Sequence, residues 1–146
     1  MSNQDERTPI IERRDNLLNA VGRDVVQLDR TVRFMDNILD FVNTSVKLNI
    51  ELAVLTAKYE AGKIHRNDFT RQRERISMDR WDSLKLCYNS VLELNEICHN
   101  FKIEPFYDGH KMCPDDVSDF ARQYATACFK NAVKELEEHS RCGTTS

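Results

Sequence analysis

The sequence predicts an all-α protein, an antiparallel bundle of three long helices with a short N-terminal helix or a helical overhang. Glycine and proline are rare, with four and three among 146 residues, which favours long helices over a β-sandwich with many turns. Apolar residues recur at spacings of three and four along most of the chain, as on one face of a helix. The length suits one core, so we expect a single domain, 1–146, with disordered tails at 1–7 and 140–146.

Two overlapping apolar stripes mark the first helical region. Thr8 and Pro9 predict its start, because a hydroxyl side chain caps a helix and proline suits the first helical position. The first stripe consists of Val21, Val25, Leu28, Val32, Met35, Leu39, Val42 and Val46, and the second of Ile38, Phe41, Ser45, Leu48, Leu52, Leu55 and Tyr59. Together they form a face wide enough for more than one neighbouring helix. Gly22 either ends a short first helix that folds back, or the helix continues to Ala61 and a second copy covers the overhang.

The remaining helices follow from the turn residues. Gly62 predicts a helix end, and the short loop after it requires an antiparallel second helix, Asp68–Phe101. The core face of that helix is predicted to hold Leu84, Cys87, Val91, Leu94, Cys98 and Phe101, widened by Trp81 and Tyr88. Residues 102–113 are predicted to be irregular, and Pro114 opens the last helix. Two apolar faces are predicted there, one of Val117, Ala121, Tyr124 and Cys128, the next of Ala125, Phe129, Ala132 and Leu136.

The last third of the chain resembles a group of small all-helical proteins from Gram-positive bacteria and their mobile elements, a domain of unknown function. The residues that carry the resemblance are Leu94, Asn95 and Cys98, then Pro105, Tyr107, Asp108 and Gly109, then Val117, Asp119, Phe120 and Ala121. The resemblance implies a helical architecture and a bacterial or phage origin. It implies no activity, because the group has none that could be carried to these residues.

Composition and motifs exclude several functions. The net charge of −3 is too small to indicate a nucleic-acid or membrane surface, and no apolar run reaches the roughly 20 residues of a membrane helix. The polar, acidic N-terminus is not a secretory signal, and five cysteines cannot all pair, so we expect a reduced, cytoplasmic protein. No phosphate-binding glycine loop or hydrolase motif is present, and we expect neither enzymatic activity nor a cofactor.

A basic run and a turn are the candidate binding residues. The run consists of Lys63, Arg66, Arg71, Arg73, Arg75 and Arg80, and it could bind a phosphate group or an acidic partner. A solvated helix face with internal salt bridges is the simpler interpretation. Tyr107 and Asp108 lie in a tight-turn sequence, which could either cover the end of the bundle or form an exposed recognition loop.

Two sets of residues have the chemistry of metal ligands. Cys98, His99, His110 and Cys113 surround the irregular segment, and thiolates and imidazoles are the ligands that Zn²⁺ prefers. Adjacent cysteine and histidine project about 100° apart on a helix, so burial of Cys98 in the core is the simpler interpretation. Glu96 and His99 have the spacing of one half of a di-iron motif, without the other half, and a surface pair is the simpler interpretation.

We therefore predict a non-enzymatic interaction protein of adaptor or inhibitor type, with a protein partner, self-association as a homodimer and no membrane association. Two alternatives stay open. One is a binder of small phosphorylated ligands or nucleic acid through the basic run 63–80, and the other is a metal protein at the 98–113 corner.

Overall fold

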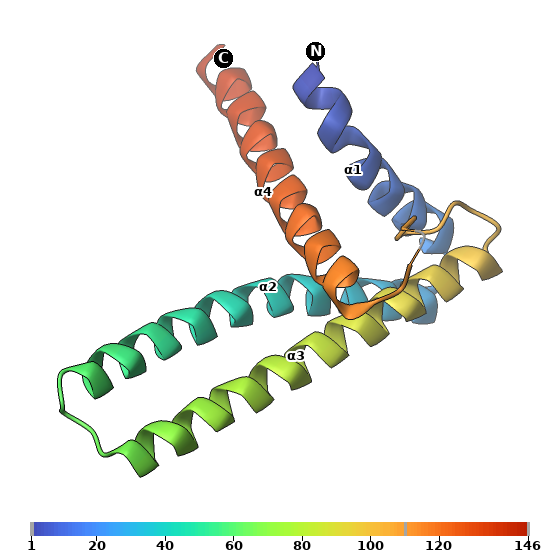
Figure 1. Ribbon diagram of the computed structural model, residues 1–146. Coiled ribbons are helices and arrows are strands. Elements are labelled where there is room, and N and C mark those ends of the chain that lie inside the picture. Colours follow the sequence, from blue (N-terminus) through green and yellow to red (C-terminus); the bar gives the residue numbers. More distant parts are fainter. Residues whose placement is uncertain (1, 110, 146) are drawn as a thin grey trace.

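The protein consists of four helices, and the predicted all-α class is confirmed (Figure 1). The computed structural model describes the backbone of residues 2–109 and 111–145, and the side chains of 9–109 and 111–140. The helices are α1 (Ser2–Val21), α2 (Val25–Glu60), α3 (Arg66–Asn100) and α4 (Pro114–Thr145). The three long helices pack against one another, with the shorter α1 before them.

Gly22 separates α1 from α2, so the region up to Ala61 forms two helices rather than one. The Gly22 N–H still donates to the Asn19 carbonyl at 3.3 Å, and the chain then turns. Asp24 caps the second helix, because its side chain accepts a hydrogen bond from the backbone N–H of Gln27 at 3.2 Å. Of the two possibilities that the sequence leaves open, a separate short first helix is confirmed, although it leaves the α2–α3 hairpin at a steep angle and does not fold back along α2 (Figure 1).

Helices α2 and α3 form a long antiparallel hairpin, as predicted (Figure 1). Gly62 ends α2 in the left-handed conformation, with φ of 71°, which residues with a Cβ rarely adopt. His65 then caps α3 by accepting a hydrogen bond from the Asn67 N–H at 3.1 Å. Towards this end of the hairpin, Leu48 and Leu55 of α2 pack with Ile76 of α3 in a small cluster.

The two predicted apolar stripes of α2 differ in how much of each is buried. The second stripe is correct, since Ile38, Phe41, Leu48 and Leu55 are all buried. The first stripe is wrong as a core face along its length: Val25, Val32 and Val46 are 77%, 42% and 54% exposed. The reason is that α1 and α4 reach only part of α2, so the same helix face is covered near its middle and uncovered elsewhere.

Helices α1 and α4 form a second antiparallel pair, which rises steeply from one end of the α2–α3 hairpin (Figure 1). The main core lies where the two pairs meet, and all four helices contribute to it. Its members include Leu17 and Val21 of α1, Met35 and Ile38 of α2, Val91 and Leu94 of α3, and Val117 and Tyr124 of α4. In the part of the chain that is described, no helix is both long enough and apolar enough to cross a membrane.

The two end helices run further than the sequence predicts. Helix α1 begins at Ser2 and carries Pro9 in its interior, and α4 continues to Thr145. These bounds include stretches 2–7 and 140–145, which the sequence assigns to disordered tails. No residue from 2 to 7 is glycine or proline, so a helix can extend there with only the loss of the hydrogen bond that Pro9 cannot donate.

Candidate functional site

The irregular segment 101–113 is held against the main core by side-chain hydrogen bonds. The side chain of Asn95 in α3 makes two hydrogen bonds to the backbone of Tyr107. Its amide nitrogen donates to the Tyr107 carbonyl at 3.0 Å, and its oxygen accepts from the Tyr107 N–H at 2.8 Å. Tyr88 of α3 adds a bond from its hydroxyl to the Met112 carbonyl at 2.7 Å. Asn95 and Tyr88 therefore have structural roles in fixing the path of this loop.

The turn at Phe106 and Tyr107 covers the core, as the first of its two predicted interpretations states. Phe106 is 1% exposed and Tyr107 is 7% exposed. Phe106 packs edge-on against the rings of Phe120 and Tyr124, at centroid distances of 5.5 and 5.3 Å. Burial also raises the pKa of Tyr107, whose hydroxyl donates to the Lys111 carbonyl at 2.9 Å. Tyr107 is thus enclosed by its own protein.

Asp108 and Gly109 complete the turn in different ways. Asp108 is exposed and lies 3.6 Å from the guanidinium of Arg13, whose Nε donates to the Phe106 carbonyl at 3.1 Å. The turn is therefore fastened to α1 as well as to α3. Gly109 lies against the Tyr107 ring so closely that any Cβ would collide with it, which explains a glycine here.

Three of the six residues of the basic run make polar contacts along α3 or across the hairpin. Arg75 bridges the two helices by pairing with Glu51 of α2, and it also contacts Asp79 at 3.0 Å. Arg80 donates to the side-chain oxygen of Asn49 at 2.6 Å. Arg71 lies 3.7 Å from Asp68. These contacts agree with the simpler interpretation, a solvated helix face with internal salt bridges.

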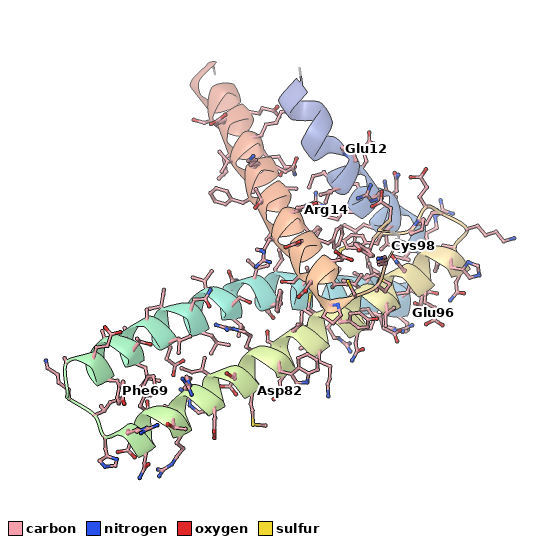
Figure 2. All side chains as sticks on the ribbon, in the orientation of Figure 1. Glu12, Arg14, Phe69, Asp82, Glu96 and Cys98 are labelled. Atoms are coloured by element: carbon pink, nitrogen blue, oxygen red, sulfur yellow. The ribbon has the colours of Figure 1, made fainter. Side chains whose placement is uncertain are left out.

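Neither Arg66 nor Arg73 has a carboxylate partner among the described residues. The Arg73 guanidinium lies over the ring of Phe69, 5.3 Å from its centroid, and Phe69 stacks on Tyr59 at 4.3 Å. Figure 2 shows Phe69 near the start of α3, at the closed end of the hairpin. Lys63, in the loop there, is exposed. This end of the hairpin is the part of the run that is open to an anion.

The cysteine–histidine corner does not gather its members. Cys98 lies among the core side chains and Glu96 on the outer side of α3 (Figure 2), and His99 is exposed. The Cys113 thiol donates to the Asp116 carboxylate at 2.7 Å, and His110 lies outside the described residues. Across residues 2–109 and 111–145, no group of three or more potential ligands comes together. Burial raises the pKa of Cys98 and raises that of Cys87 to about 12, so both thiols are neutral and poor ligands or nucleophiles.

A polar cleft lies between α1 and residues 102–104 of the irregular segment. It has a volume of about 620 Å³ and is lined by Arg13, Asn16, Asn19, Ala20, Lys102, Ile103 and Glu104. Lys102 has φ of 59°, the left-handed conformation, at the end of α3. The cleft combines two cations with one carboxylate. The guanidinium of Arg13 is already paired with Asp108, which does not line the cleft.

Apolar faces of α4 and α3 are exposed in the structure, and the sequence pattern alone did not identify them as exposed. The sequence predicts two apolar faces on α4, and of these the face of Val117, Ala121 and Tyr124 is buried. On the other face Phe129 is 70% exposed and Leu136 is 67% exposed, with Val133 between them also partly exposed. Helix periodicity identifies both faces as apolar but cannot say which of them the rest of the chain reaches. We call Phe129, Val133 and Leu136 the α4 face.

A second uncovered surface lies on α3, opposite α2. Met78, Trp81, Lys85, Tyr88 and Leu92 follow one another there at alternating spacings of three and four. Trp81 is 57% exposed instead of widening the core as predicted, whereas Tyr88 is half-buried and packs against the main core as predicted. Beside it is an almost wholly apolar pocket of about 300 Å³, lined by Trp81, Leu84, Lys85, Tyr88, Asn89 and Pro114. We call this surface, with its pocket, the α3 groove. Lys85 is its only ionisable side chain apart from Tyr88, and it has no ion-pair partner among the described residues.

Comparison of the chain with protein-family models, with curated proteins and with solved structures finds no match. The function is therefore argued from the surfaces themselves.

Proposed function

We propose that the protein is a non-enzymatic helical interaction protein of adaptor or inhibitor type that also self-associates. The observation that carries the proposal is the α4 face, where two large apolar side chains are about two-thirds exposed on a helix whose opposite face is already buried. Exposed apolar residues are common singly, but a row of them on one side of a helix is typical of a surface that another helix covers.

Three further observations support a binding role over catalysis and favour the cytoplasm. The buried thiols of Cys87 and Cys98 are neutral, which removes the most reactive groups of the core as nucleophiles. The hydroxyl of Tyr107 and the amide of Asn95 are occupied in holding the loop. Four described cysteines are free, which suits a reducing compartment.

Site-directed photocrosslinking tests this proposal in the cells that encode the protein. A benzophenone amino acid at position 129 should give a discrete covalent adduct with a protein. The same amino acid at position 25 is the matched control, because Val25 is equally exposed but lies away from both surfaces. Absence of any adduct at position 129, or the same adducts at both positions, would contradict an interaction role for the α4 face.

A second candidate function is binding of a phosphorylated ligand or nucleic acid at the closed end of the hairpin. It rests on Arg66 and Arg73, which have no carboxylate partner in the described chain, and on the Tyr59–Phe69 stack beside them. Reversal of both arginines to glutamate should abolish salt-dependent binding of a single-stranded oligonucleotide. Reversal of Arg75 is unsuitable, because it would also break the Arg75–Glu51 bridge between α2 and α3. If the wild-type protein shows no salt-dependent binding, this candidate is rejected.

A further inference from the structure

We propose that the α3 groove is the receptor for the α4 face of a second copy of this chain, so that two copies form a closed dimer through two identical contacts. This inference rests on the proposed function and identifies the partner and the surfaces. Its starting point is that one chain carries both an uncovered apolar ridge and an uncovered apolar groove, on different helices.

The shapes of the two surfaces correspond. Phe129, Val133 and Leu136 lie at positions i, i+4 and i+7 of α4, the spacing with which an amphipathic helix inserts anchors into a groove. Among the described apolar side chains of α4, Phe129 and Leu136 protrude most. The α3 groove supplies the complementary hollow, with aromatic walls from Trp81 and Tyr88. Aromatic anchors and aromatic walls are the usual centre of a protein interface.

A chain cannot fill its own groove. Pro114 lines the groove and begins α4, so the groove and the base of α4 are fixed to each other. Phe129 lies about 22 Å further along the same helix, at a rise of about 1.5 Å per residue. Figure 1 shows α4 leaving the hairpin and rising with α1, which carries the α4 face away from α3. The contact is therefore between copies.

The charges of the two surfaces also match. Lys85 is exposed in the groove without a partner. Glu137 follows Leu136 at the edge of the α4 face and is likewise exposed, and no ion pair of it is seen among the described residues. A docked α4 brings a carboxylate to the one cation of an otherwise apolar groove, which favours this pairing over a contact between two α4 faces.

The apolar area lies at the lower end of what a stable dimer buries, about 600–1,000 Å² per partner. A fully exposed aromatic side chain offers about 150–250 Å², so Phe129 and Trp81, 70% and 57% exposed, present roughly 250 Å² together. Val133, Leu136, Met78 and Leu92 extend the apolar area to roughly 600 Å² on each copy, against about 800 Å² per partner in a stable interface. Each copy buries both surfaces because the contact is reciprocal, which also closes the assembly at two chains.

Sedimentation velocity of wild-type protein and variants tests the inference. We expect a wild-type dimer, and a rise of about 100-fold in the dissociation constant for Phe129→Glu and for Trp81→Glu, since each change disrupts both contacts. Val25→Glu is the matched control and should remain dimeric, because Val25 is more exposed than either residue and lies outside both surfaces. Circular dichroism of each variant checks that the helices persist.

Mixing the two variants gives the sharper test. A mixed dimer of Phe129→Glu and Trp81→Glu chains keeps one intact contact, between the normal α4 face of one chain and the normal groove of the other. The mixture should therefore dimerise where each variant alone does not. If Trp81→Glu disturbs folding, Lys85→Glu should weaken the dimer and the double change Lys85→Glu with Glu137→Lys should restore it.

Three results would overturn the inference: a monomeric wild type, dissociation by Phe129→Glu with no effect of groove changes, or variants that do not complement each other. A monomeric wild type with a photocrosslink from position 129 to a different protein would reject this inference and the proposed self-association, and would leave the adaptor or inhibitor role standing. A monomer without any crosslink would reject both.

Discussion

Replacement of Asn95 by alanine should destabilise the protein by about 2–4 kcal/mol. The change removes two hydrogen bonds to Tyr107, of 3.0 and 2.8 Å, each of which contributes about 0.5–1.5 kcal/mol net. It also leaves the N–H and the carbonyl of a 7%-exposed residue without partners, and an unsatisfied buried group costs about 1–3 kcal/mol. Partial access of water to the loop keeps the total below the full sum.

Urea denaturation followed by circular dichroism measures this change. Asn100→Ala is the matched control, because Asn100 is exposed on the same helix, and it should alter the free energy of unfolding by less than about 0.5 kcal/mol. Asn95→Asp keeps the acceptor for the Tyr107 N–H and loses the donor, so its effect should fall between the two. An Asn95→Ala variant as stable as the control would refute the claim that this side chain holds the loop.

Other parts of the fold give four further predictions. Thr31→Val should raise the free energy of unfolding by about 1–2 kcal/mol, because the Thr31 hydroxyl is buried without a hydrogen-bond partner in the described structure; an unchanged or lower urea midpoint would contradict this. Lys102→Gly should raise the free energy of unfolding by about 1 kcal/mol, because glycine adopts the positive φ of this position without strain. A lower free energy of unfolding in the same assay would show that the lysine side chain stabilises the fold by more than the strain costs. Cys87, which is buried and has its pKa raised to about 12, should resist alkylation in the folded protein at pH 8–9, whereas the partly exposed Cys113 is accessible to the reagent; peptide mass spectrometry reads both sites. The raised pKa stabilises the fold fully below pH 9, and this contribution is lost as the pH rises towards 12, so Cys87→Ala should flatten the decline of stability over that interval.

Local signals in the sequence predicted the helices well. Gly62 marks the end of α2 because its backbone needs a left-handed conformation, and Pro114 marks the start of α4. The stripe through Ile38, Leu48 and Leu55 faces α3 as its spacing predicts. These features depend on neighbouring residues alone, which is why the sequence contains them.

The candidate surfaces could not be predicted in the same way. Val46 and Phe129 occupy the same apolar spacing pattern as buried residues of their helices. They are exposed because α1 and α4 leave the hairpin at a steep angle (Figure 1). The role of Asn95 depends on the path of a loop that returns to it twelve residues later. Burial of Tyr107 depends on that same path, so its sequence allowed both a cover and a recognition loop.

Native mass spectrometry of the untagged wild-type protein tests the central claim, self-association of an interaction protein, most directly. We expect a dominant species of twice the chain mass of 17.1 kDa that falls to one chain mass with Phe129→Glu. A species of one chain mass at every concentration would contradict it.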